Sequence, residues 1–212
     1  MKEHHFTTQR TARYHTLGEL NNQTKTIWII LHGYMQSARF FIKQFEELKN
    51  DTAFIVAPEA LSKAYVNGVS GKVGASWMTK EDRENEIADY IFYLNSLSKH
   101  ILANVPNSCA IRLLGFSQGV SALCRWYAQS EINAEQIILW CGTFPADMLL
   151  YKGNKQWKNV HLVSASNDSY ITPEKTEEQK KLLTSLGIHY TEHYFEGKHE
   201  INTELLRQIA SC

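Results

Sequence analysis

The chain has 212 residues, a length typical of one domain, and its 22 basic residues balance 22 acidic ones to give zero formal net charge. Without a surplus of positive charge, neither nucleic-acid binding nor polybasic membrane docking is expected. A hydrophobic content of 43% with 21% charged residues is typical of a globular protein and excludes a disordered chain.

Cysteine spacing and the N-terminal sequence indicate where the protein works. The four cysteines form no CxxC pair and are Cys109, Cys124, Cys141 and Cys212. Scattered thiols of this kind favour a reducing compartment. Residues 1–15 lack the apolar stretch of a signal peptide, and no later run is long enough to span a bilayer. We therefore expect one soluble, cytoplasmic domain over residues 1–212, without stable membrane insertion or a nucleic-acid partner.

Short apolar runs alternate with longer amphipathic stretches, which predicts βαβ units around a mostly parallel sheet. The segment 6–17 alternates and predicts an antiparallel strand. Predicted strands follow at 26–32, 52–57, 110–116, 136–141 and 160–165, with an edge strand at 189–196. Helices are predicted at 38–49, 81–102, 118–130, 174–186 and 200–210. Residues 61–76 have three glycines and no periodicity, so we expect a long loop there.

The segment Gly115-Phe116-Ser117-Gln118-Gly119 separates a predicted strand from a predicted helix. This is the G-x-S-x-G nucleophile elbow in its expected context, where small flanking residues let the strand and the helix pass close together. The helix N-terminus would direct backbone N–H groups at the oxyanion formed during acyl transfer. The alternative is an ordinary tight turn between two glycines, and the flanking elements favour a nucleophilic Ser117.

A serine hydroxyl is a weak nucleophile at neutral pH, so it requires a base and an orienting acid. In the α/β-hydrolase order these follow the serine as the acid and then the histidine. Asp168 comes directly after the strand at 160–165 and is the preferred acid, with Asp147, after the preceding strand, as the alternative. His199 lies between the last predicted strand and the last helix and is the preferred base.

The segment Leu31-His32-Gly33-Tyr34-Met35 ends the first buried strand. A strand followed by His-Gly supplies a second oxyanion N–H in this architecture. We expect the amide of Tyr34, with that of Met35 as the alternative, to act with the amide of Gln118, while His32 braces the loop. Apolar side chains at predicted strand ends are expected to wall a substrate pocket, although core packing is the ordinary role of each alone. These residues are Met35, Trp77, Met78, Phe144 and Tyr170.

Six segments together resemble the phospholipase/carboxylesterase family of α/β-hydrolases, which includes acyl-protein thioesterases: ILHGYMQSA, VAPEA, ASWM, LLGFSQG, SNDSYITP and GKHEI. The resemblance extends from about Thr26 to the C-terminus. It implies an α/β-hydrolase fold and hydrolysis of esters or thioesters by a Ser-His-Asp triad without a cofactor. The chain departs from the family pattern at Val120, where a glycine is usual, and at Thr79, where an aspartate is usual.

These observations predict an α/β-hydrolase with a mostly parallel central sheet of about seven strands, helices on both faces and no large lid. We predict a serine hydrolase of carboxylic esters with short to medium acyl chains. Its partner would be a small-molecule ester, and no cofactor or metal is expected. The alternatives are an acyl thioesterase, a lysophospholipase and a non-catalytic, ligand-binding relative. The oligomeric state is left open, with a homodimer as one alternative.

Overall fold

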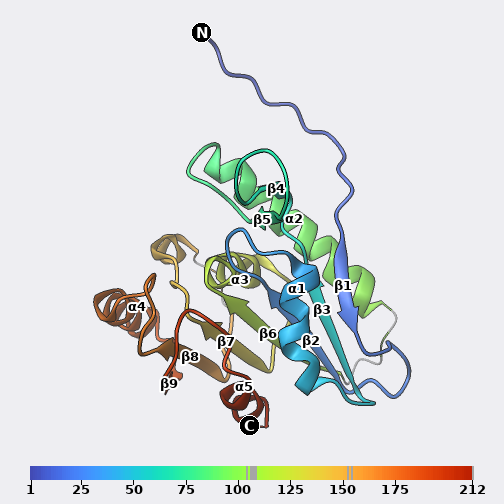
Figure 1. The fold of residues 1–212 in the computed structure, drawn as a ribbon, viewed down its shortest axis with the longest axis vertical. Helices are drawn as coiled ribbons and strands as arrows, with labels where there is room; N and C mark the ends of the chain where they lie inside the picture. Colours follow the sequence, from blue (N-terminus) through green and yellow to red (C-terminus); the bar gives the residue numbers. More distant parts are fainter. Residues whose placement is uncertain (104, 106–108, 152, 154, 212) are drawn as a thin grey trace.

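In the computed structural model, which describes residues 1–103, 105, 109–151, 153 and 155–211, seven strands form one central sheet (Figure 1). Their order across the sheet is β1-β3-β2-β6-β7-β8-β9. The strands are β1 (Tyr14–Leu17), β2 (Thr26–Leu31), β3 (Ala53–Pro58), β6 (Ala110–Phe116), β7 (Gln136–Trp140), β8 (Val160–Ala165) and β9 (Tyr190–Phe195). Strand β1 pairs antiparallel with β3, and the other neighbouring pairs are parallel. The predicted mostly parallel sheet is confirmed.

Helices cover both faces of this sheet, as predicted, and the sheet separates the hydrophobic core into two clusters. Neighbouring residues of β2 show the division, because Ile29 belongs to one core and Ile30 to the other. Successive strand side chains point to opposite faces, which explains why the central strands are apolar throughout. One face carries α2 (Arg83–Leu102), α3 (Gln118–Gln129) and α4 (Pro173–Ser185). The other carries α1 (Ala38–Phe41), the 3₁₀ helix η1 (Ile42–Leu48) and α5 (Thr203–Ala210).

The expected long loop at 61–76 is wrong, because this segment contains an antiparallel hairpin of β4 (Ser62–Tyr65) and β5 (Val73–Ser76). A tertiary contact anchors it, since Gln36 forms a β-bridge with Ala75. A Cβ at position 74 would lie 2.1 Å from the carbonyl oxygen of Met35, so only glycine permits this approach. Sequence periodicity could not show this contact between distant segments.

Apart from shifts of one to three residues at helix and strand ends, three other elements differ from the prediction. Only residues 14–17 of the predicted strand at 6–17 pair in the sheet. The helix predicted at 38–49 is a single α-helical turn that continues as η1. A short 3₁₀ helix, η2 (Ala146–Leu150), follows β7 and was not predicted. Among the described residues, no helix is long and apolar enough to cross a membrane.

The carboxyl ends of the parallel strands lie along one edge of the sheet, and the predicted site residues follow them there. Ser117 directly follows β6, Asp168 follows β8, and His199 follows β9. This edge is where open α/β sheets bind their ligands. The fold therefore brings together side chains that are far apart in the sequence.

Candidate active site

Ser117 occupies a strained turn between β6 and α3. Its φ of 54° and ψ of −120° lie in a region that side chains with a Cβ rarely adopt, at a cost of about 1–3 kcal/mol. Its N–H donates to the carbonyl of Trp140 at 2.9 Å. A Cβ at Gly115 would lie 2.6 Å from the Gly119 carbonyl oxygen, and one at Gly119 would lie 2.2 Å from that of Leu31. Both glycines of the motif are thus required for the close passage of strand and helix.

His199 and Asp168 form a direct hydrogen bond of 2.7 Å between Nδ1 and Oδ2. The other carboxylate oxygen, Oδ1, accepts the N–H groups of Tyr170 at 2.8 Å and Ile171 at 2.9 Å. Burial opposes ionisation of Asp168, but the hydrogen bonds from His199 and these amides outweigh it and lower the pKa of the carboxyl below its ordinary value. An ionised carboxylate only accepts, so Nδ1 of His199 carries the proton and Nε2 is the nitrogen left to act as a base.

The imidazole of His199 lies beside the nucleophile elbow. Its ring centroid is 4.8 Å from that of Phe116, the residue directly before Ser117. Tyr170 packs against the same imidazole at 4.8 Å. The ring therefore lies next to the residue that precedes the serine, at the same end of the sheet.

Asp147, the alternative acid, is held elsewhere by two arginines. Arg125 donates Nε to Oδ2 at 2.8 Å and Nη2 to Oδ1 at 3.0 Å, and Arg83 donates Nη2 to Oδ2 at 3.0 Å. Burial opposes ionisation of this carboxyl as well, but Arg125 and Arg83 lower its pKa below the ordinary value. This ion-pair cluster joins η2 to α2 and α3, so Asp147 has a structural role.

His32 braces the loop after β2. Its Nε2 accepts the N–H of Ala60 at 3.1 Å, so Nδ1 carries the ring proton and donates to the carbonyl of Gly33 at 2.8 Å. Burial lowers the pKa of His32 to about 4, so the ring is neutral near pH 7. The Gly33 carbonyl also accepts the N–H of Gln36 at 3.2 Å. With that oxygen held by two donors, the N–H of Tyr34 points to the opposite side of the same planar, trans peptide.

The hydrogen bonds of this loop distinguish the two predicted oxyanion donors. Gly33 N–H donates to the side chain of Gln36 at 2.8 Å, and Met35 N–H donates to a carbonyl of β5 at 2.9 Å. Within the described part of the chain, the amide of Tyr34 has no acceptor. A Cβ at Gly33 would lie 3.1 Å from Cβ of Ser117, so the loop lies against the elbow. This geometry favours Tyr34 over Met35.

The side chain of Gln118 has a role that sequence reasoning missed. Its Oε1 accepts the N–H of Trp77 at 3.0 Å, and its Nε2 donates to the carbonyl of Met78 at 2.7 Å. The indole of Trp77 in turn donates to the carbonyl of His32 at 2.8 Å. The first residue of α3 thus ties the elbow to the oxyanion loop through the segment after β5. The glutamine within the motif is the only sequence signal for this link.

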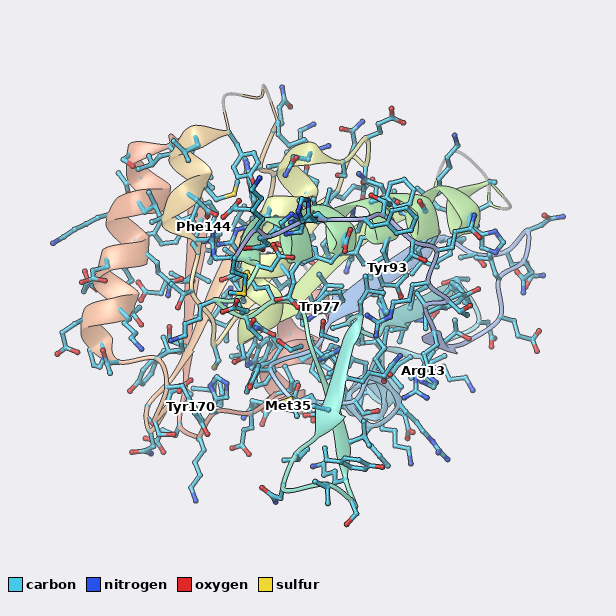
Figure 2. The ribbon with its side chains drawn as sticks, turned by 90° about the horizontal axis from the view of Figure 1, so that it is seen from above. Arg13, Met35, Trp77, Tyr93, Phe144 and Tyr170 are labelled. Atoms are coloured by element: carbon cyan, nitrogen blue, oxygen red, sulfur yellow. The ribbon has the colours of Figure 1, made fainter. Side chains whose placement is uncertain are left out.

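The predicted pocket residues separate into two groups (Figure 2). Phe144 is 1% exposed and packs in the core against Trp157, well away from Met35 and Tyr170, so its assignment to the pocket is wrong. Trp77 is also a core residue, 2% exposed, and braces the site from beneath. Met35 and Met78 are half-buried, and Tyr170 is exposed beside His199.

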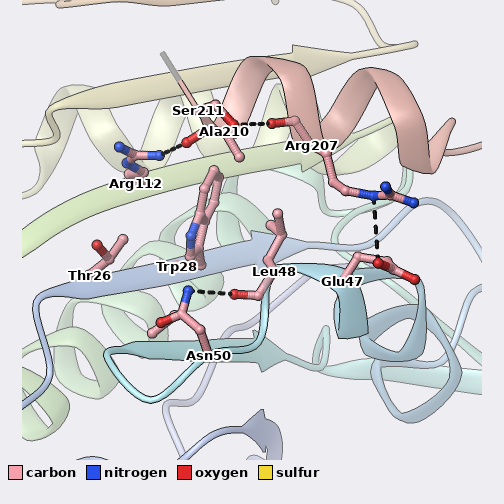
Figure 3. A pocket seen from close by; sticks show the side chains of 10 residues that line it. Thr26, Trp28, Glu47, Leu48, Asn50, Arg112, Arg207, Ala210 and Ser211 are labelled. Atoms are coloured by element: carbon pink, nitrogen blue, oxygen red, sulfur yellow. Dashed lines mark hydrogen bonds and ion pairs between the residues drawn. The ribbon is translucent and has the colours of Figure 1, made fainter.

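A cavity of about 360 Å³ lies at the opposite edge of the sheet (Figure 3). Thr26, which begins β2, lines it together with Arg112 of β6. The guanidinium of Arg112 stacks over Trp28 at 5.4 Å and donates to the carbonyl of Ala210 at the end of α5. Glu47 and Arg207, which also line the cavity, form an ion pair with each other at 3.5 Å. The cavity is remote from Ser117.

Among the described residues, two groups bring three metal-ligating side chains together. In one, single ligand atoms of Cys141, Asp168 and His199 lie within 4.8 Å of one another. Nδ1 of His199 and Oδ2 of Asp168, two of the atoms that could bind an ion, are already joined by a hydrogen bond of 2.7 Å. The other group, Glu3, His5 and Asp82, lies on the exposed surface.

Comparison with known proteins shows the wider relationship. The family described as phospholipase/carboxylesterase matches residues 17–212. Esterase PE8 aligns over 94% of this chain and 100% of that one, with 23% identity and a TM-score of 0.67. Acyl-protein thioesterase 2 of Zea mays aligns over 95% and 97%, with 14% identity and a TM-score of 0.72. A phospholipase/carboxylesterase of Dyadobacter fermentans aligns over 97% of both chains, with 18% identity and a TM-score of 0.70. At these identities the likeness shows the fold alone, and no curated protein matches the sequence.

Proposed function

The chain belongs to the phospholipase/carboxylesterase family of α/β-hydrolases, and from this premise we propose that it hydrolyses carboxylic esters of short to medium acyl chain through an acyl-enzyme on Ser117. The observation that carries the proposal is the 2.7 Å hydrogen bond between His199 and Asp168 beside the strained serine turn. A nucleophile, a base and an orienting acid at one strand edge are the parts that acyl transfer requires.

The reaction follows from these positions. Nε2 of His199 takes the proton of Ser117 while Oγ attacks the ester carbonyl carbon, and Asp168 holds the imidazole in the required tautomer. The amides of Tyr34 and Gln118 stabilise the oxyanion, each worth about 2.7–4 kcal/mol of barrier. His199 then protonates the leaving alcohol. The same histidine next activates a water molecule, which releases the acid and restores the serine.

The surroundings of the site support an apolar acyl group. Tyr34 and Tyr170 expose large parts of their rings beside the elbow and His199. Met35 and Met78 are half-buried nearby, and flexible thioether side chains adapt to ligands of differing shape. We therefore propose a pocket open to solvent that accepts uncharged esters of several chain lengths.

A panel of p-nitrophenyl esters of increasing acyl length tests this proposal. The wild-type protein should hydrolyse the shorter members, and Ser117→Ala and His199→Ala should each lose nearly all turnover while remaining folded. Ser121→Ala, one turn further along α3, is the matched control and should stay active, because among the residues that the structure describes its hydroxyl bonds only to the carbonyl of Thr143. Comparable turnover by Ser117→Ala would refute the assignment, and so would a wild-type protein inactive on every ester.

Thioester hydrolysis is the second candidate function. The same relay would serve it, and the maize protein of similar fold is an acyl-protein thioesterase. Pairs of oxygen esters and thioesters with identical acyl groups would separate the two activities by their ratio of kcat/KM, and lysophosphatidylcholine would test the lysophospholipase alternative. Labelling of Ser117 by a fluorophosphonate probe would exclude a non-catalytic role.

We also propose a cytoplasmic site of action with a small-molecule ester as the partner. The described cysteines, Cys109, Cys124 and Cys141, are free thiols, which supports a reducing compartment. Cys212 lies outside the described residues.

A further inference from the structure

The end of strand β7 contacts the nucleophile on one side and the acid on the other. The carbonyl of Trp140 accepts the N–H of Ser117 at 2.9 Å. A Cβ at Gly142 would lie 2.4 Å from the Ser117 carbonyl oxygen, so this glycine packs directly against the elbow. Between them, Cys141 has a φ of 43° and donates its N–H to Val163 of β8 at 2.8 Å. This turn therefore fixes the elbow relative to the strand that precedes the acid.

The thiol of Cys141 faces the acid–base pair. Its Sγ lies within 4.8 Å of a carboxylate oxygen of Asp168 and a ring nitrogen of His199, and the residue is 1% exposed. The thiol faces the Asp168 carboxylate, and Glu200, next to the histidine, adds negative charge to its surroundings. Burial together with Asp168 and Glu200 raises the pKa of this thiol, so it keeps its proton and remains a donor.

Burial and a retained proton exclude the other roles that a cysteine could have here. A nucleophilic cysteine must be a thiolate with access to substrate, and such thiols lie in electropositive, partly exposed surroundings. Cys141 has an anionic neighbour in Asp168 and almost no exposed surface. What remains available to it is donation of a hydrogen bond.

We propose that Cys141 is a positioning residue whose S–H donates to the Asp168 carboxylate and thereby sets both the orientation and the basicity of the His199–Asp168 pair. The inference rests on the proposed serine hydrolase mechanism. The structure gives the carboxylate three donors, the imidazole and the amides of Tyr170 and Ile171, and the proposed bond from the thiol is a fourth. Removing the thiol makes the carboxylate more basic, which favours the protonated imidazole. That form cannot accept the serine proton.

The test is the pH profile of kcat/KM for a short p-nitrophenyl ester. In Cys141→Ala the acidic limb, the pH range in which kcat/KM falls because His199 becomes protonated, should move to higher pH by about half a unit. At a fixed pH within this range, kcat should therefore be lower than in the wild type. Cys141→Ser keeps a donor of similar size, so the pH of its acidic limb should equal or lie below that of the wild type. Cys124→Ala is the matched control, because this cysteine is equally buried but lies on α3 in the opposite core. It should lower the thermal midpoint without moving the limb.

Other outcomes would overturn the inference. If Cys141→Ala lowers stability but its pH profile superimposes on that of the wild type, or if the serine variant fails to restore the limb, Cys141 only fills space. If the alanine variant does not fold, Cys141→Gly also removes the donor, is compatible with the φ of 43° at this position, and should show the same upward shift. An NMR titration of the His199 imidazole in wild type and variant tests the same shift without turnover. Because the titration needs no turnover, the two proposals can fail separately. A wild-type protein without esterase activity would refute the proposed function, whereas an unchanged titration of His199 in the variant would refute this inference.

Discussion

Replacing Asp168 by asparagine would test the pairing at the centre of the site with almost no change in volume. Oδ1 of Asp168 accepts the backbone N–H groups of Tyr170 and Ile171. The asparagine carbonyl oxygen must occupy this position, because an amide NH2 group cannot accept. The NH2 group then faces Nδ1 of His199, which has to become an acceptor and move its proton to Nε2. A protonated Nε2 cannot take the proton of Ser117.

The expected effect is large because the wrong tautomer removes the base. Aspartate-to-asparagine replacement in a serine-protease triad lowers kcat about 10⁴-fold, equivalent to about 5.5 kcal/mol of barrier. We expect a loss of the same order here. Hydrolysis of p-nitrophenyl butyrate at saturating substrate measures kcat, and circular dichroism shows whether the variant is folded.

The matched control is Asp147→Asn, which changes the same chemical group in the alternative acid. This substitution weakens the ion pairs with Arg125 and Arg83, and Arg125 is only 3% exposed. We expect the free energy of unfolding to fall by about 1–3 kcal/mol while kcat of the folded protein is retained. The reasoning is refuted if Asp168→Asn keeps more than a tenth of the wild-type kcat. Collapse of kcat in folded Asp147→Asn would refute it equally.

Two further predictions concern stability. His161 bonds to His193 at 2.8 Å, and burial, His193 and a nearby arginine lower the pKa of His161 to about 4. Because the unfolded chain binds this proton near an ordinary pKa of about 6.5, the stability that His161 contributes is complete above that pH and falls toward pH 4, by up to about 1.4 kcal/mol per pH unit. His32, whose pKa burial also lowers to about 4, adds a slope of the same sign, so in urea titrations His161→Gln should reduce the slope without removing it. Gly119→Ala places a Cβ 2.2 Å from a carbonyl oxygen and should abolish activity and lower the thermal midpoint, whereas Gly153→Ala, with its nearest atom 3.8 Å away, should leave both unchanged. Equal midpoints for the two alanine variants would contradict the packing argument.

Local patterns in the sequence were enough to predict the layers of the fold and the order of the site residues. Strand residues such as Ile29 and Ile30 face opposite cores, so the apolar runs themselves indicate a sheet covered on both faces. The backbone conformation at Ser117 could also be predicted from the sequence, because the glycines, the strand and the helix that determine it all lie within a few residues of the serine.

Only the tertiary structure decided between alternatives whose partners come from distant segments. Asp147 and Asp168 both follow a strand, but the first meets two arginines from α2 and α3 and the second meets His199. Tyr34 differs from Met35 because a hairpin some 40 residues away accepts the Met35 N–H. Phe144 belongs to the core because of what packs over it. Periodicity and motifs describe a side chain's neighbours along the chain, whereas hydrogen-bond partners and burial depend on which segments fold against it.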